Sequence, residues 1–267
     1  MTKLLEKMNF HIHFQNINIT PYFLFVSLGL VVGCLIFVFH NKELKKYRND
    51  LFYCFLYTFV GIIIGAKLLY ILSVLKYLIQ NPNLWFYILD GGLVFYGGVI
   101  GGIIGALLYI RTYKMPLMDF LDNAALAIPI GHAIGRLGCL FGGCCYGKPT
   151  NSIFGIIYPE SNLMAPSSIR IHPVQLYESI ANLLIFFTIL IISRKYKTKG
   201  MLGGMYFMLY GVARFTLEFL RADFRGNVWF LSTSQFISIF MILLGMILFI
   251  GKYNDKLEKC LEKKTDK

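Results

Sequence analysis

The sequence predicts an all-α membrane protein with seven transmembrane helices. Of the 267 residues, 57% are hydrophobic and only 15% are charged, whereas an ordinary soluble domain has about 25% charged residues. The mean hydropathy is +0.62. The apolar residues also gather in charge-poor segments of roughly 20 residues, the length that a helix needs to cross a bilayer. These segments are residues 20–40, 51–74, 93–111, 117–137, 174–193, 201–220 and 232–251.

The basic residues predict the orientation of the helices, because cytoplasmic loops collect lysine and arginine. Sixteen of the 26 basic residues follow the first, third, fifth and seventh segments. We therefore expect the N-terminus outside and the C-terminus in the cytoplasm. The predicted organisation is an extracytoplasmic arm (1–19), a seven-helix domain (20–251) with a small outer insert (147–171) between helices four and five, and a basic cytoplasmic tail (252–267). The arm has no apolar core followed by a small-residue cleavage site, so we do not expect a signal peptide.

The net charge of +12 does not predict nucleic-acid binding, because its distribution follows the membrane topology rather than one continuous basic face. A cytoplasmic rim attracted to anionic membrane lipid accounts for it. The six cysteines do not form the framework of a small secreted protein. Cys34 and Cys54 are expected to be apolar fillers within helices, whereas Cys139, Cys144 and Cys145 form a cluster that needs an explanation.

Charged residues inside the apolar segments indicate a functional interior, since each costs about 2.5–3.5 kcal/mol at the centre of a membrane helix. Arg136 ends the fourth segment, and His132 precedes it by one turn on the same face. The sixth segment and the residue after it carry four polar side chains at spacings of four, four and three: Tyr210, Arg214, Glu218 and Arg221. Two arginines from separate helices suit a phosphate, and a phospholipid headgroup is the obvious anion there. The alternative is that Arg214 neutralises Glu218 while Arg136 reaches out to the outer headgroups.

Two further motifs stand at the predicted outer ends of helices. Asp90, Gly91 and Gly92, followed by Tyr96, Gly97 and Gly98, precede and open a segment whose glycines recur every four residues, a pattern typical of close helix packing. A bare backbone there could also approach a headgroup. The fifth segment opens with HPVQLYES (172–179), in which Gln175 and Glu178 share a face. This is either an ordinary helix start, with proline in the first turn, or a polar lining of the same outer cavity.

Taken in order from about Tyr22 to Gly251, these motifs resemble the prolipoprotein diacylglyceryl transferase family. The motifs are DGG-x3-YGG (Asp90 to Gly98), GRLG (Gly135 to Gly138) continuing to Gly147, HPVQLYE (His172 to Glu178) and YGVARFTLEFLR (Tyr210 to Arg221). The resemblance implies a multi-pass enzyme of the bacterial plasma (inner) membrane. Such an enzyme moves the diacylglyceryl group of phosphatidylglycerol onto the lipobox cysteine of a preprolipoprotein signal peptide, and releases glycerol 1-phosphate.

The resemblance also implies roles for particular residues. Arg136 and Arg214 would stabilise the departing phosphate more strongly in the transition state than in the ground state, and Glu218 would hold Arg214. The catalytic set is completed by His132, Tyr96 and Tyr210. The expected substrate-binding residues are Tyr22, Asp90, Gly91, Gly92, Gly97, Gly98, Gly138, Cys139, Cys144, Gly147, His172, Gln175 and Glu178. Phosphatidylglycerol, preprolipoprotein signal peptides and membrane lipid are the expected partners; no cofactor, metal or nucleic acid is expected.

The chain departs from the family pattern at the positions expected to act on the nucleophile. After the arginine the family usually continues Gly-Asn-Phe-x-Asn-x-Glu-x-x-Gly, but here Cys139, Gly142 and Cys144 stand in place of Asn, Asn and Glu. Tyr96 stands where the best-known members carry an essential histidine. Tyrosine, with a pKa near 10, is a poor base for a thiol with a pKa near 8.5. We therefore hypothesise that His132 accepts the proton of the acceptor thiol, directly or through Tyr96.

The sequence leaves several interpretations of the cysteines open. They could be structural substitutes for Asn and Glu, a disulfide between Cys139 and Cys144 on the oxidising side, or a nucleophile promoted by Arg136. A metal site shared with His132 is disfavoured, because seven helical residues separate it from Cys139 by about 10 Å. Three alternative functions follow: a paralogue acting on a different acceptor, a phospholipid-binding or transport protein, and a thiol redox protein of the membrane.

Overall fold

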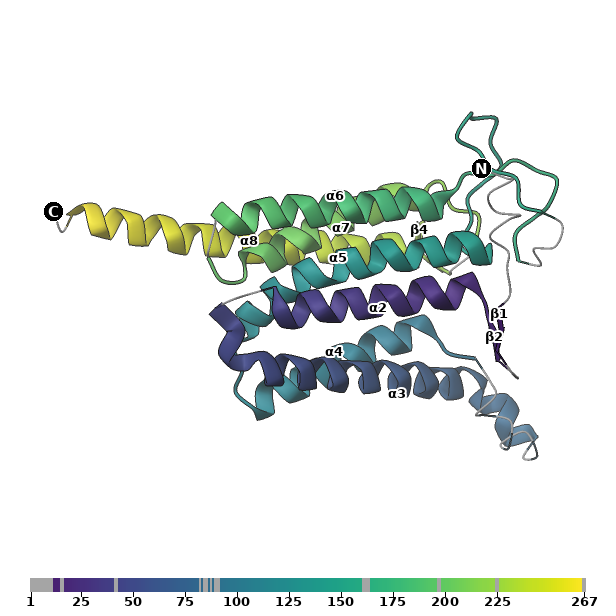
Figure 1. Ribbon diagram of the computed structural model, residues 1–267, viewed down its shortest axis with the longest axis horizontal. Coiled ribbons are helices and arrows are strands. Elements are labelled where there is room, and N and C mark those ends of the chain that lie inside the picture. The colour runs from purple at the N-terminus through teal and green to yellow at the C-terminus, as the bar shows by residue number, and fades with distance from the viewer. Residues whose placement is uncertain are drawn as a thin grey trace. The chain divides into compact units, whose positions relative to one another are not determined.

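A computed structural model describes residues 12–14, 17–40, 43–81, 83, 86, 88, 92–159, 164–195, 198–223 and 226–265. Each of the seven predicted segments corresponds to one α-helix (Figure 1). The helices are α2 (Pro21–Phe39), α3 (Arg48–Gln80), α4 (Phe95–Thr112), α5 (Leu117–Gly142), α6 (Val174–Lys195), α7 (Met201–Glu218) and α8 (Thr233–Thr265). Six of them are long and apolar enough to cross a membrane. The other, α7, carries Arg214 and Glu218, which lower its hydropathy. The predicted all-α membrane fold is confirmed.

The helix bounds differ from the prediction mainly by extension. α3 runs six residues beyond the predicted end at residue 74, and α5 continues to Gly142, so Cys139 lies within a helix. α8 continues to Thr265, through most of the predicted tail. This extension agrees with the lysine, glutamate and leucine content of the tail, because these residues favour helix. Hydropathy detects the membrane-crossing part of a helix and misses its polar continuation.

The remaining regular structure is short. A 3-10 helix, η1 (Glu43–Tyr47), precedes α3. Strands β1 (Ile12–Phe14) and β2 (Ile17–Ile19) pair antiparallel within the predicted N-terminal arm, and β3 (Asn227–Val228) pairs with β4 (Leu231–Ser232) between α7 and α8. The described chain divides into two compact units, one formed by Met1–His40 with Leu121–Lys267 and the other by Asn41–Phe120.

In the unit Asn41–Phe120, α3 and α4 lie side by side (Figure 1). Glycines on both helices make this approach possible. A Cβ added to Gly97 would overlap the carbonyl oxygen of Gly65, and one added to Gly101 would overlap that of Gly61. The glycine repeat predicted from the sequence therefore acts in close helix packing, as glycines do where membrane helices approach backbone to backbone.

Replacing Gly101 with Val is expected to destabilise this helix pair. The new side chain would collide with backbone atoms of α3, which cannot rotate away, and overpacking of this kind costs about 1–3 kcal/mol. A lower midpoint of thermal unfolding in detergent would show the loss. The matched control is Gly251→Ala on α8, where an added Cβ meets nothing within 4 Å and alanine favours helix. Equal midpoints for the two variants would contradict the packing argument.

The core of the other unit lies between α5, α6 and α7. Its buried members are Ala125, Leu126, Ile185, Ile189, Leu202 and Tyr206. α8 packs along α7, where a Cβ added to Gly245 would lie 2.6 Å from the carbonyl oxygen of Gly204. α2 approaches α5 in the same way, through Gly29 and Gly131. Small residues thus allow close helix contacts along both sides of the α5–α7 core.

Polar contacts fix the register of these helices. On α5, the buried Asn123 donates from Nδ2 to the carbonyl oxygen of Phe37 on α2, at 2.7 Å. The carboxylate of Asp122 accepts hydrogen bonds from the backbone amides of Gly200 and Gly203, at 2.7 and 2.9 Å. The first amides of a helix have no partner within it. Asp122 therefore anchors the beginning of α7 to α5.

The outer insert predicted between helices four and five fills the interval between α5 and α6. Its base is joined to the end of α7 by backbone hydrogen bonds from Lys148 to Leu220, at 2.8 Å, and from Ala222 to Tyr146, at 3.2 Å. It has a small core of its own, packed on the end of α5: Leu140, Ile156, Tyr158, Ala165 and Ile171. The described residues of the insert thus form a cap over the ends of α5 and α7.

Candidate active site

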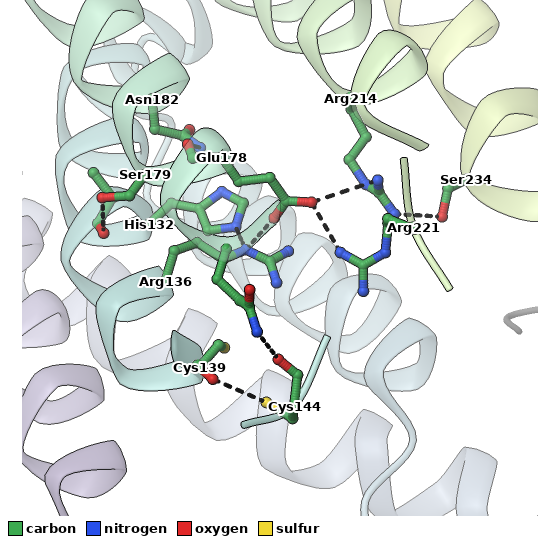
Figure 2. Close-up of polar contacts among 12 residues, drawn as sticks. His132, Arg136, Cys139, Cys144, Glu178, Ser179, Asn182, Arg214, Arg221 and Ser234 are labelled. Atoms are coloured by element: carbon green, nitrogen blue, oxygen red, sulfur yellow. Dashed lines mark hydrogen bonds and ion pairs between the residues drawn. The ribbon is translucent and has the colours of Figure 1, made fainter. Parts of the chain in front are cut away.

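A group of buried charged side chains lies where α5 and α7 end and α6 and α8 begin (Figure 2). Arg136 projects from α5, Glu178 from α6 and Arg214 from α7, and Arg221 follows α7. All four have exposed fractions of 9% or less. Buried charges persist only when they are paired and hydrogen-bonded, so the contacts within this group decide which charges remain for a ligand.

Glu178 stands at the centre of the group and contacts three arginines (Figure 2). Its Oε2 contacts Nε of Arg136. Its Oε1 lies 2.9 Å from Nη1 of Arg221 and 3.6 Å from Nη1 of Arg214. Arg136 and Arg214 therefore share one anion, which is a carboxylate of the protein itself. A lipid phosphate shared by the two stays a prediction.

Two more carboxylates complete the charge balance. Glu218 lies 2.6 Å from Nη1 of Arg214, one turn along α7, so Glu218 holds Arg214 as expected. Asp223 accepts two hydrogen bonds from Arg221, at Nε (2.9 Å) and Nη2 (2.7 Å). Burial lowers the pKa of Arg221, but the bonds to Asp223 and the charge of Glu178 outweigh it and raise that pKa above its ordinary value. Arg221 thus stays charged, and the cluster is neutral before any ligand binds.

The three arginines differ in how many of their donors are used. Arg221 has Nε, Nη1 and Nη2 all engaged. Arg214 uses Nη1 for carboxylates and Nη2 for the hydroxyl of Ser234, at 2.9 Å. Arg136 makes its contacts through Nε alone, and its two terminal amino groups have no hydrogen bond to the described residues. Because those two groups form the fork that grips phosphate or carboxylate, Arg136 is the arginine most available to a ligand.

His132 contacts Arg136 directly. Its Nε2 accepts a hydrogen bond from Nε of Arg136 at 3.1 Å, and its ring lies 5.6 Å from the ring of Tyr210. A neutral imidazole has one acceptor nitrogen, and here that nitrogen faces a guanidinium. The geometry gives His132 a role in positioning Arg136. Its predicted role as base for a thiol stays a prediction.

Cys139 lies in the last turns of α5 and Cys144 just after it, beside the charged group (Figure 2); Cys145 follows. The sulfur atoms of Cys139, Cys144 and Cys145 all lie within 4.8 Å of one another, and each residue is half-buried. All three are thiols, and no disulfide joins them. Hydrogen bonds from Cys139 and Cys144, reinforced by the charges of Arg136 and Arg221, lower the pKa of Cys145. The Cys139–Cys144 disulfide, one of the interpretations that the sequence left open, is not formed in this structure.

The surroundings of the cluster hold it in place. Gln175, which is fully buried, donates from Nε2 to the carbonyl oxygen of Cys144 at 2.6 Å and to the hydroxyl of Tyr158 at 3.2 Å. The hydroxyl of Tyr158 donates in turn to the carbonyl oxygen of Leu140, at 2.8 Å. Burial raises the pKa of Tyr158, so this hydroxyl keeps its proton. Gln175 thus acts as a support of the thiol loop.

Most of the predicted site residues come together in one unit. Tyr22 contacts the end of α5, where a Cβ added to Gly142 would meet its ring at 3.3 Å and one added to Gly138 would meet its carbonyl oxygen at 2.9 Å. The amide of Gly147 donates to the carbonyl oxygen of His172 at 3.0 Å. Nδ1 of His172 lies 3.4 Å from the hydroxyl of Tyr177. The segments carrying these residues therefore meet around the charged group and the cysteines.

The other predicted residues are not placed with this group. Tyr96, Gly97 and Gly98 open α4, and Gly92 precedes it; all four belong to the unit Asn41–Phe120. Asp90 and Gly91 lie outside the described residues. A proton path from a thiol to His132 through Tyr96 stays a prediction.

Three residues of the site were missing from the predicted set. Arg221 belongs to the polar stripe recognised in the sixth segment, and its spacing of three from Glu218 could have included it. It reaches Glu178 from the turn after α7, because the helix ends at Glu218. Asp223 lies in irregular structure after α7, where no helical period predicts which way a side chain points. Ser234 is the second residue of α8, and a single serine at a helix start gives no signal of a partner on another helix.

Comparison with known proteins identifies the family of the chain. The family model for prolipoprotein diacylglyceryl transferase matches residues 9–251. The chain is 38% identical to the phosphatidylglycerol–prolipoprotein diacylglyceryl transferase of Clostridium tetani, over 87% of this chain and 93% of the relative. It is 36% identical to transferase 2 of Clostridium perfringens (87% and 91%) and 35% identical to the enzyme of Rickettsia conorii (83% and 89%). The chain therefore belongs to the prolipoprotein diacylglyceryl transferase family.

Proposed function

We propose that this protein transfers the diacylglyceryl group of phosphatidylglycerol to the lipobox cysteine of preprolipoproteins and releases glycerol 1-phosphate. Its site would lie in the outer half of the bacterial inner membrane, where a preprolipoprotein signal peptide presents its cysteine. Family membership supports the reaction class. The observation that carries the assignment within the molecule is the open guanidinium fork of Arg136 inside a buried charge cluster.

The reaction needs a site that stabilises a leaving phosphate. The acceptor sulfur forms a C–S bond with the glyceryl carbon while the C–O bond to phosphate breaks, and the electron pair stays on the phosphate oxygen. The thiol proton leaves with a base or water. Charge grows on the phosphate as the bond breaks, so donors fixed in advance lower the barrier. Arg136 supplies the free fork, and Glu178 and His132 fix its direction at Nε.

Arg214 is the second arginine of the mechanism. It is fixed on both sides, by Glu218 at 2.6 Å and by the hydroxyl of Ser234 at 2.9 Å. Its distance of 3.6 Å from Glu178 is its longest contact, so a phosphate would displace this contact before the others. The phosphate gains negative charge as its bond to the glyceryl carbon breaks. Arg214 would therefore bind the phosphate more strongly in the transition state than in the ground state.

His132 is expected to act through Arg136 or as the thiol base, and two substitutions separate these roles. Glutamine keeps a hydrogen-bond acceptor but cannot take a proton at neutral pH. If His132 only positions Arg136, His132→Gln retains most of the transfer and His132→Ala loses about tenfold. If His132 is the base, both variants lose about 10²-fold or more. Transfer by His132→Ala at the unchanged rate would contradict both roles.

A second candidate function is transfer to an acceptor other than a lipobox cysteine. The observation in its favour is that Cys139 and Cys144 replace the residues that the family usually has at these positions. Purified protein with phosphatidylglycerol separates the two. The proposed function predicts glycerol phosphate release with a lipobox peptide and none with its Cys→Ser counterpart. Restored lipoprotein lipidation in a bacterium depleted of its own transferase would agree. Release with another thiol but none with the peptide would overturn the proposed acceptor.

A further inference from the structure

The thiol cluster has a geometry that ordinary packing does not require. Adjacent residues usually direct their side chains apart, yet the sulfur atoms of Cys144 and Cys145 lie within 4.8 Å of each other and of that of Cys139. The backbone adopts an uncommon conformation to achieve this. Cys145 has a φ of +61°, and Gly143 has a φ of +72°. A left-handed conformation costs a non-glycine residue about 1–2 kcal/mol, and such strain collects where a function needs it.

The two segments that carry the sulfurs are fixed to each other. The chain of hydrogen bonds from Gln175 through Tyr158 joins the loop at Cys144 to the last turn of α5 at Leu140, the residue after Cys139. The loop is also tied to the residue after Arg221, since the amide of Ala222 donates to the carbonyl oxygen of Tyr146. In metal sites, hydrogen bonds from neighbouring residues hold the ligands in position in a similar way.

The sulfur spacing fits a metal ion. Zinc binds thiolates at about 2.3 Å in a tetrahedron, so two thiolates on one ion lie about 3.8 Å apart. The three sulfurs, within 4.8 Å of one another, each need to move by at most about 0.6 Å to reach that spacing. Soft thiolate ligands select zinc or copper(I) over magnesium and calcium. Arg136, three residues before Cys139 on α5, places a positive charge about one helical turn from the cluster.

We propose that Cys139, Cys144 and Cys145 form a three-thiolate site for zinc whose fourth position is open to an exogenous thiol. Three protein ligands with one open position is the arrangement of catalytic zinc sites, whereas structural sites are closed by four. His132 is not one of these ligands, since its Nε2 faces Arg136.

The open position gives the site a role that rests on the proposed function. An acceptor thiol that binds zinc there loses its proton to water and remains as a thiolate, because a coordinating thiol is deprotonated. Its sulfur then forms the bond to the glyceryl carbon as the C–O bond breaks and the electron pair passes to the phosphate held by Arg136. The metal would thus activate the acceptor without a protein base.

Metal content tests the site independently of activity. Full-length protein purified under reducing conditions and dialysed against zinc is expected to retain about one zinc per chain. Cys139→Ser, Cys144→Ser and Cys145→Ser are each expected to lose it, whereas Cys34→Ser, a thiol outside the cluster, keeps it. Gln175→Ala is expected to weaken zinc binding about 10- to 100-fold. Bound zinc should also protect the three wild-type thiols from alkylation, a readout that needs no variant.

Any of three results would overturn the metal site. One is wild-type protein that holds no more zinc than the triple Cys→Ser variant. Another is an intact mass about 2 Da lower under native redox conditions, with Cys139 linked to Cys144 or Cys145, which identifies a redox pair. Zinc retained in full by all three single variants would equally contradict a three-thiolate site.

Cobalt replacement tests the open position. A thiolate joining Co²⁺ adds charge-transfer absorption, so a lipobox peptide is expected to increase that band and its Cys→Ser counterpart to leave it unchanged. Zinc removal by a chelator is expected to slow transfer about tenfold or more. Activation by the metal is overturned if the cobalt spectrum does not change when the peptide is added. It is also overturned if transfer continues at the full rate after the metal is removed. The proposed transferase function stands in both cases. Metal binding without transfer to any lipobox peptide overturns the proposed function instead.

Discussion

Replacing Glu178 with Gln is expected to give the largest loss of both activity and stability. Glu178 is almost fully buried and contacts three guanidinium groups. Without its charge, the buried cluster carries an excess positive charge, and removing one partner of a buried ion pair costs about 3–5 kcal/mol. Arg136 also loses the carboxylate that directs its fork. We expect transfer to fall at least about 10²-fold and the midpoint of thermal unfolding to fall with it.

Two controls define this expectation. Glu178→Asp keeps the charge on a shorter side chain and should recover part of the stability but little of the transfer. Asp50→Asn removes a different carboxylate, one that accepts a single hydrogen bond from the hydroxyl of Tyr109 at 3.1 Å, and should cost only about 1 kcal/mol. Were Glu178→Gln to unfold at the wild-type midpoint with full transfer, the carboxylate could not be the centre of the cluster.

Arg136→Lys is expected to lower transfer strongly while sparing the fold. Lysine keeps the positive charge near Glu178 but lacks the planar fork that matches phosphate. We expect kcat to fall about 10²- to 10³-fold, the usual effect of removing one transition-state donor. The midpoint of thermal unfolding should change little, because Arg136 contacts the protein through Nε alone. The measurement is glycerol phosphate release at saturating lipid, beside thermal unfolding.

Arg221→Lys is the matched substitution. All three nitrogens of Arg221 contact Glu178 or Asp223. Arg221→Lys should therefore lower the stability of the protein, and it should lower kcat less than Arg136→Lys does. If the two variants lose kcat equally and only Arg136→Lys unfolds at lower temperature, our ranking of the arginines by their free donors is wrong.

The fold was largely predictable because hydrophobicity and helix length are properties of contiguous residues. Each apolar segment became a helix, and the glycine repeat of α4 indicated the close contact with α3 that the structure has. What hydropathy could not predict was where polar helix continues, as at the end of α8. The described chain groups into two compact units, and the single seven-helix domain stays a prediction. Such a division depends on packing between residues that are distant in sequence.

The site was predictable in its residue types and less so in its pairing. Charges inside apolar segments pointed to Arg136, Arg214 and Glu218, and helical spacing placed each on a face. Spacing could not show that Glu178, predicted as a lining residue, would join the arginines. That contact depends on how α6 lies against α5 and α7. The proximity of the three sulfurs depended likewise on backbone turns at Gly143 and Cys145, which no periodicity describes.

The hydrogen bonds that join the insert to the end of α7 restrict how the site can open. Lys148 is bonded to Leu220, and Gly147 forms a β-bridge with Arg221 itself. Lifting the base of the insert away from the helices would pull on the backbone of Arg221, one of the three arginines that contact Glu178. Lifting the insert off the site would then also disturb the ion pair between Arg221 and Glu178. A lipid that enters laterally between helices would leave these backbone hydrogen bonds intact.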